Sequence, residues 1–263
     1  MTKPPDTTGP VLVATGIGKR FGGLQAVQGV SLEAHAGRIV SVIGPNGAGK
    51  TTFFNCLSGI YRPEAGTVRL AGRDLVGLKP HQISHAGLAR SFQNIRLFPE
   101  MTALQNVLVG RYAHTQAPLW KIVCRTPGYL HQERAARDRA MELLEFVELS
   151  PRAGDWARSL PYGLQRRLEV ARALATDPKV LLLDEPGAGM NPSEIVGMMD
   201  LVRRIAATGI AVVVIEHHMK LVMEISDHIL VLDHGEPIAE GAPDQVRSNP
   251  RVLEAYLGAE AAA

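Results

Sequence analysis

The sequence predicts an α/β fold with a mainly parallel sheet, an antiparallel β portion at the N-terminus and an inserted helical subdomain. Near-continuous apolar runs at 179–183, 210–215 and 228–232 alternate with helical patterns, as is typical of parallel strands that are covered on both faces. Residues 11–43 instead contain short strand patterns separated by glycine turns. Residues 95–175 are mostly helical in pattern and interrupt the alternation of strands and helices.

These patterns divide the chain into a discontinuous core, a helical insertion and a tail. We assign 1–94 and 176–249 to the α/β core, 95–175 to the helical subdomain and the alanine-rich residues 250–263 to a short C-terminal tail. Besides the three apolar runs, strand patterns lie at 11–14, 27–32, 39–43, 66–70 and 89–93. Apolar residues at helical spacing predict helices at 52–57, 81–88, 102–112, 130–149 and 164–175.

The composition excludes several classes of protein. The chain has 263 residues, of which 46% are hydrophobic, so it can bury a full core. Its net charge of +2 is too small to indicate nucleic-acid binding. The apolar run at 210–215 is far shorter than the ~20 residues that cross a bilayer, and residues 1–10 lack the apolar stretch of a signal peptide. We therefore expect a soluble, cytoplasmic chain with no nucleic-acid partner.

A phosphate-binding loop is the most informative feature of the chain. Residues 44–51 match the pattern G-x-x-x-x-G-K-[ST], with a buried-strand pattern before them and a helical pattern after them. Glycines let backbone N–H groups turn toward phosphate oxygens, Lys50 neutralises the β- and γ-phosphates, and the helix N-terminus attracts anions. The Thr51 hydroxyl is suited to Mg²⁺. The expected nucleotide ligands are Gly44, Pro45, Asn46, Gly47, Ala48, Gly49, Lys50, Thr51 and Thr52.

Two carboxylates follow the apolar strand at 180–183. Asp184 stands at the carboxyl end of the strand, where it can hold Mg²⁺ through water. Glu185 follows it and is placed to orient or deprotonate an attacking water. Acidic residues at the end of a strand are usually solvated surface, but the phosphate loop upstream in the same chain favours the functional interpretation.

Other candidate residues depend on less specific signals. His217 ends the apolar strand at 212–215 and can reach the γ-phosphate. If the chain is extended there, His217 and His218 point to different sides, and we expect His218 to face solvent. Phe21 is a candidate for stacking on the adenine, with ordinary core packing as the alternative.

One segment carries a specific family resemblance. Residues 159–167 read Ser-Leu-Pro-Tyr-Gly-Leu-Gln-Arg-Arg, and this resembles the signature segment of ABC ATPases, which is usually Leu-Ser-Gly-Gly-Gln followed by Gln-Arg. The order of aromatic residue, phosphate loop, glutamine loop, signature, Asp-Glu strand and histidine loop is also similar to that family. The resemblance covers essentially the whole chain and implies a P-loop NTPase core.

The resemblance implies an ATPase that uses Mg²⁺ and works as a head-to-tail dimer with two ATP molecules between its subunits. It adds Gln93 to Glu185 and His217 as a catalytic residue, and it implies that Thr51, Gln93 and Asp184 hold the metal. Tyr162 and Gly163, at the start of the signature helix, are implied to contact the nucleotide of the partner subunit through the helix N-terminus. Pro161 and Leu164 depart from the family pattern, where Ser and Gln are usual.

Further segments are similar to one subgroup of this family. Residues 87–98, 216–223 and 235–258 resemble the LivG-type ATPase of high-affinity branched-chain amino-acid importers. The resemblance implies a subunit that energises such an importer from the cytoplasmic face of the inner membrane, as a peripheral protein. Its implied partners are two transmembrane permease subunits, a second ABC ATPase subunit and, indirectly, a periplasmic or extracellular solute-binding protein.

Three alternatives stay open or are less favoured. The same ATPase can serve an importer for another amino acid, an amide or urea, because the solute is chosen by other subunits. A non-transport ABC ATPase, for example one acting in cofactor assembly, also fits the motifs. A GTPase or small-molecule kinase is disfavoured, because the chain contains no Asn-Lys-x-Asp guanine motif and Glu185 beside Asp184 favours attack by water.

Overall fold

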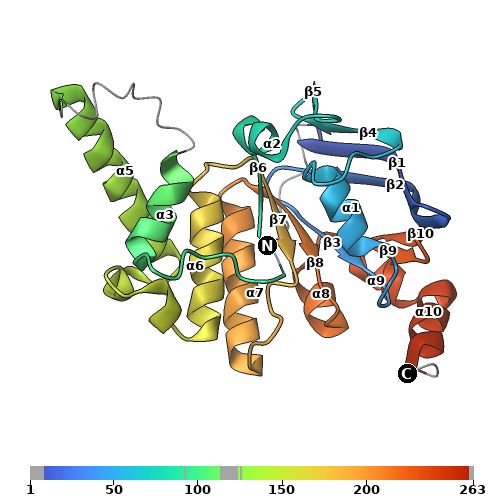
Figure 1. Cartoon of the computed structure of the whole chain (residues 1–263). Coiled ribbons are helices and arrows are strands. Elements are labelled where there is room, and N and C mark those ends of the chain that lie inside the picture. The colour runs from blue at the N-terminus through green and yellow to red at the C-terminus, as the bar shows by residue number, and fades with distance from the viewer. Residues whose placement is uncertain (1–8, 92, 113–123, 125, 261–263) are drawn as a thin grey trace.

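The structure is a computed structural model that describes residues 9–91, 93–112, 124 and 126–260. Most of the polar N-terminus considered above, and Phe92 in the segment before the glutamine loop, lie outside the described residues. Two sheets and a group of helices make up the described chain (Figure 1).

The larger sheet has six strands in the order β10-β9-β3-β8-β7-β6. Its central strands are β3 (Ile39–Ile43), β8 (Ala211–Ile215) and β7 (Val180–Asp184), which run parallel and are buried along their whole length. Strand β9 (His228–Asp233) is parallel to β3, and β10 (Glu236–Gly241) is antiparallel to β9 at one edge. The prediction of a mainly parallel sheet built from apolar runs is confirmed.

The smaller sheet is antiparallel and has the order β2-β1-β4-β5. Its strands are β1 (Leu12–Phe21), β2 (Leu24–Ala34), β4 (Ala65–Leu70) and β5 (Arg73–Asp74). Strand β1 continues to Phe21, well beyond the predicted residues 11–14, because register shifts let it keep pairing with β2 across its glycines.

Helix α1 (Lys50–Leu57) packs between the two sheets (Figure 1). Phe53 and Phe54 are completely buried and share one apolar cluster with residues of both sheets. Cys56, on the same helix, is also buried, and this burial raises the pKa of its thiol to about 11. The helix that starts in the phosphate loop is therefore held on both faces by the core.

The helical part of the chain forms a second apolar cluster, at the left in Figure 1. Helix α3 (Ala103–Arg111) packs against α5 (Pro127–Phe146) and α6 (Tyr162–Leu174). Both α5 and α6 begin two or three residues before their predicted starts, and in each a proline stands at or just before the first turn, where it is tolerated. Helix α7 (Pro192–Ala207) connects this cluster with the larger sheet.

Shorter helices complete the fold. Helix α2 (Pro80–Ala86) precedes β6 (Leu88–Arg90), and α8 (Met219–Ile225) follows β8. Helix α9 (Pro243–Arg247) follows β10. Residues 250–263, which were expected to form a short tail, contain a further helix, α10 (Pro250–Glu260). Val252 of α10 is buried in a cluster with residues of β9, so tertiary packing orders this segment. Among the described residues, no helix combines the length and the apolar character that a membrane crossing requires.

A buried ion pair connects the edge strand β6 to the neighbouring strand β7 and to α1. Nη2 of Arg90 donates to Oδ2 of Asp184 at 2.9 Å, and both side chains are almost inaccessible to solvent. Nη1 of Arg90 donates to the side-chain oxygens of Asn55 and Ser58 on and after α1. Burial lowers the pKa of Arg90, and its contact with Asp184 opposes that shift. Charged groups are tolerated in such a place only when they are paired and hydrogen-bonded.

Replacing Arg90 should therefore destabilise the fold strongly. In Arg90→Met the Asp184 carboxylate stays buried without its partner, and we expect the free energy of unfolding to fall by about 3–5 kcal/mol. Urea denaturation measures this change. Arg152→Met is the matched control, since Arg152 pairs with Asp155 at the surface, and it should cost less than about 1 kcal/mol. Equal losses in the two variants would contradict a stabilising role for the buried pair.

Candidate functional site

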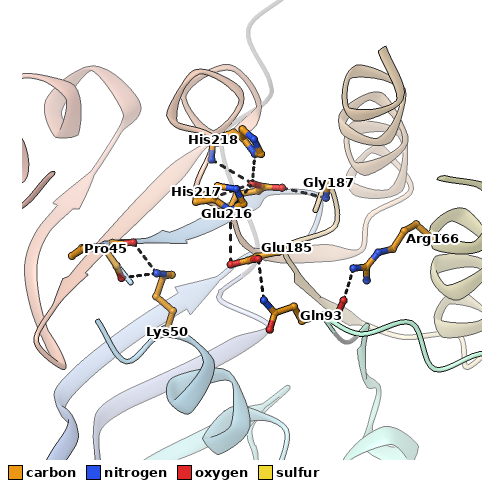
Figure 2. A network of polar contacts seen from close by, with 10 residues as sticks. Pro45, Lys50, Gln93, Arg166, Glu185, Gly187, Glu216, His217 and His218 are labelled. Carbon is orange, nitrogen blue, oxygen red and sulfur yellow. Dashed lines mark hydrogen bonds and ion pairs between the residues drawn. The ribbon is translucent and has the colours of Figure 1, made fainter. Parts of the chain in front are cut away.

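The candidate residues meet because three parallel strands end at one edge of the larger sheet. Asp184 pairs with Ile215 between β7 and β8, and Val42 pairs with Ile215 between β3 and β8. The residues that follow these strands therefore emerge side by side, as Figure 2 shows for Pro45, Glu185 and His217. Ligands of open α/β sheets bind at the carboxyl ends of the strands.

The phosphate loop needs glycine where its backbone approaches other backbone most closely. A β-carbon on Gly44 would lie 2.0 Å from the carbonyl oxygen of Leu232, and one on Gly49 would lie 2.4 Å from that of Ala26. Both glycines also have positive φ angles, 149° and 92°. A side chain at Gly44 would push the loop away from β9 of the larger sheet, and one at Gly49 would push it away from β2 of the smaller sheet. The two glycines of the motif therefore meet a steric requirement.

Lys50 is the first residue of α1, and its ammonium group lies inside the loop (Figure 2). Nζ donates to the carbonyl oxygens of Gly44 and Pro45, at 2.7 and 2.8 Å. The side chain is buried, and this burial lowers the pKa of Lys50, whereas the negative charges of Glu185 and Asp184 oppose that shift. A phosphate oxygen that enters the loop meets a positive charge already held at its centre.

A cavity of about 550 Å³ lies beside the loop, a volume in the range of small-molecule sites. Residues 46–52 form one wall, and the sequence-predicted residues Phe21, Gln93 and Glu185 line it together with His234. Phe21 is 42% exposed, and its ring packs against Tyr61 in a T-shaped arrangement with a centroid distance of 5.1 Å. Phe21 is thus a wall of the cavity rather than a core residue, and its partly exposed ring suits stacking on a flat base.

The three predicted catalytic residues lie next to one another (Figure 2). Nε2 of Gln93 donates to Oε2 of Glu185 at 3.2 Å, and Nδ1 of His217 lies 3.8 Å from Oε1 of the same carboxylate. Glu185 has a φ angle of 48°, which is rare for a residue with a side chain. Such strain is common at functional sites, and here it turns the chain just after Asp184.

His217 and His218 were expected to point to different sides if the chain is extended there, and this condition is not met. Their rings lie against each other, with centroids 4.2 Å apart and planes tilted by 36°. The chain is not extended after Ile215, because the backbone N–H groups of both histidines turn toward Glu216. Both imidazoles are about half exposed, so the expectation of an accessible His218 holds.

The donor set at this edge fits a magnesium ion. Thr51 and Gln93 line the cavity, whereas Asp184 is buried at the end of β7, directly before Glu185, and does not itself line the cavity. Hydroxyl, amide and carboxylate oxygens are the protein ligands that Mg²⁺ prefers. Arg90 binds one oxygen of Asp184, Oδ2, and fixes the orientation of the carboxylate.

Tyr162 and Gly163 do not line this cavity. They form the first turn of α6, where the Tyr162 hydroxyl accepts hydrogen bonds from Nε and Nη2 of Arg166 at 3.2 and 2.9 Å. Arg166 also donates to the carbonyl oxygen of Gln93 (Figure 2). The start of the signature helix is thereby connected to the glutamine loop, and any nucleotide contact of Tyr162 or Gly163 stays a prediction.

Three charged residues with side chains almost inaccessible to solvent were not singled out from the sequence, namely Arg90, Arg166 and Glu216. Each lies beside a predicted site residue, and each has at least one hydrogen-bond partner on a distant part of the chain. The sequence did offer one signal, which is a charged residue next to an apolar run. A charged side chain in such a place is rarely buried unless it is paired. That signal shows that a partner exists but does not identify it.

Two protein-family models match the chain. A model of the family described as ABC transporter matches residues 27–188. A second model, described as branched-chain amino acid ATP-binding cassette transporter, matches residues 236–262, which include α10. The first match runs from β2 of the smaller sheet to the loop after β7, and the second runs from β10 into the C-terminal helix.

Individual relatives are similar over nearly the full chain. The high-affinity branched-chain amino acid transport ATP-binding protein BraF of Pseudomonas aeruginosa is 48% identical over 95% of this chain and 98% of its own length. The protein LivG of Escherichia coli, which carries the same description, is 46% identical with the same coverage.

A crystal structure of the ADP conformation of an ATP-binding cassette of an ABC transporter has a TM-score of 0.83 and 33% identity, and covers 95% of this chain and 100% of its own. A nucleotide-free cassette has a TM-score of 0.81 with 32% identity, covering 94% and 98%. The chain therefore belongs to the ATP-binding cassette family of ABC transporters.

Proposed function

We propose that this chain is the ATP-hydrolysing subunit of an ABC importer for branched-chain amino acids. The observation that carries the proposal is a single cavity lined by the phosphate loop, Gln93 and Glu185, with His217 against the same carboxylate. Because the chain belongs to the ABC transporter family, we assign the hydrolysis of ATP to this cavity. The solute is proposed because relatives such as BraF and LivG are described as branched-chain amino acid transport proteins.

In the proposed mechanism, Lys50 exchanges the carbonyl oxygens of Gly44 and Pro45 for oxygens of the β- and γ-phosphates. The loop N–H groups and the N-terminus of α1 supply further positive potential. Thr51, Gln93 and Asp184 would hold Mg²⁺, which would neutralise charge on the phosphates.

Hydrolysis requires a water molecule aimed at the γ-phosphate. Glu185 is placed to orient this water and to accept its proton, because its carboxylate faces the cavity just beyond the loop. Gln93 and His217 contact the two different oxygens of Glu185 and so fix its direction. His217 is also placed to sense the γ-phosphate.

The position of the signature segment supports a dimeric enzyme. Tyr162 and Gly163 lie outside the cavity of their own chain, and we propose that they close the nucleotide site of a second ABC ATPase subunit. The contact of Arg166 with the Gln93 carbonyl gives residues 95–175 a direct link to the hydrolytic centre. We propose that this link transmits motion to two transmembrane permease subunits at the cytoplasmic face of the membrane, with a solute-binding protein acting on the outer side.

Glu185→Gln tests the hydrolytic role. The amide cannot accept the proton of water, and we expect kcat to fall by roughly 10²- to 10⁴-fold while ATP affinity stays within a few-fold of the wild type. Phosphate release and a nucleotide-binding titration measure the two quantities. Glu142→Gln, on the exposed face of α5, is the control and should hydrolyse normally. If Glu185→Gln turns over at the wild-type rate, the general base lies elsewhere.

Purification from membranes tests the transport role. We expect the full-length chain, extracted in mild detergent, to bring with it two multi-spanning permease proteins and a second ATPase, which mass spectrometry identifies. The genes of these partners lead to the solute-binding protein, whose ligand shows whether the solute is a branched-chain amino acid. A partner set without membrane proteins contradicts the importer and favours a role in cofactor assembly.

A further inference from the structure

Glu216 is a fully buried carboxylate between two loops of the site. Its exposed fraction is 0%, and it directly follows β8, whereas its hydrogen-bond partners come from the loops after both β7 and β8. Burying a carboxylate is costly unless hydrogen bonds replace its hydration. Glu216 does not line the nucleotide cavity. We therefore look for its function in the two loops that its hydrogen bonds connect.

The two oxygens of Glu216 serve different loops (Figure 2). Oε1 accepts a hydrogen bond of 3.2 Å from the N–H of Gly187, two residues after Glu185. Oε2 accepts hydrogen bonds from the backbone N–H groups of His217 and His218, at 3.0 and 3.4 Å, and lies 3.1 Å from Nδ1 of His218. One side chain therefore joins the loop that carries the proposed base to the loop that carries His217.

The result of this connection is a fixed place for His217. Its Nδ1 lies 3.8 Å from Oε1 of Glu185 and 3.8 Å from Oε2 of Glu216. The ring is otherwise about half exposed, so packing alone does not hold it there. The hydrogen bonds at Glu216 determine the backbone turn from which the ring projects.

We propose that Glu216 is a positioning residue for ATP hydrolysis, which holds His217 against Glu185 by anchoring its loop to Gly187. This inference rests on the proposed function. Because Glu216 does not line the nucleotide cavity, its loss should affect turnover and leave ATP binding nearly unchanged. A displacement of about 1 Å at a reacting centre can lower a rate by roughly 100-fold.

Glu216→Gln has almost the same shape and removes this bridge. A carboxamide has one acceptor oxygen and one NH₂ group, so in either orientation one loop meets a donor where it needs an acceptor. For the full-length chain we expect kcat to fall about 10- to 100-fold, with the KM for ATP within about twofold of the wild type. Asp227→Asn is the matched control, because Asp227 accepts from the N–H of Ile39 at the opposite end of β3, and its kcat should be unchanged.

A double-mutant cycle separates positioning from a general structural effect. If Glu216 acts through His217, then Glu216→Gln should change kcat by less than about threefold in a His217→Ala background. Losses that multiply in the double variant, or a rise in KM that accounts for the whole effect, overturn the inference. If Glu216→Gln does not fold, Gly187→Ala tests the same contact, since its β-carbon would lie 3.0 Å from Oε1 of Glu216, and an unchanged kcat in that variant overturns the inference too.

The same assay distinguishes this inference from the proposed function. If the wild-type chain hydrolyses ATP and Glu216→Gln does so at the same rate, only the role of Glu216 fails. If the wild-type chain has no ATPase activity, the proposed function fails. If His217→Ala retains full activity while Glu216→Gln loses it, Glu216 does not act through His217 and the inference is wrong.

Discussion

The parallel pairing of β3, β8 and β7 is the constraint on which the site depends. These strands are buried throughout and aligned so that their carboxyl ends meet at one edge. The phosphate loop, Glu185 and His217 follow these ends, although they are far apart in the sequence. A shift of register by one residue would reverse the side chains at the end of a strand, so the strand pairing that forms the sheet also places the candidate catalytic groups.

Behind this edge, buried charges are held by specific partners. Arg90 binds Asp184, and Glu216 binds the N–H groups of two loops. On the side of the nucleotide cavity, the side chains of Glu185 and His217 are partly exposed to solvent. This arrangement separates two tasks: the buried groups fix the loops at a cost that their hydrogen bonds offset, and the exposed groups remain free to meet nucleotide and water.

The sequence was sufficient to predict the phosphate loop and the Asp184-Glu185 pair, because the residue types and spacing of both motifs are local. It was not sufficient to predict the contact of Arg90 with Asp184, since 94 residues separate them. The directions of His217 and His218 could be stated only for an extended chain, and the hydrogen bonds at Glu216 end the extended segment there. Helix α10 was missed for a similar reason, since its order depends on packing against β9.

The proposed function requires that residues 44–51 bind the phosphates of ATP with Lys50 at the centre of the loop. The most direct test is the ATP affinity of the full-length chain and of Lys50→Ala, measured by isothermal titration calorimetry with Mg²⁺ present. A charge-assisted hydrogen bond contributes about 1.5–3 kcal/mol, so we expect the Kd of Lys50→Ala to be roughly 10- to 100-fold higher than that of the wild type. The exposed Lys79→Ala variant should bind like the wild type, and an unchanged Kd in Lys50→Ala would show that Lys50 does not bind the phosphates.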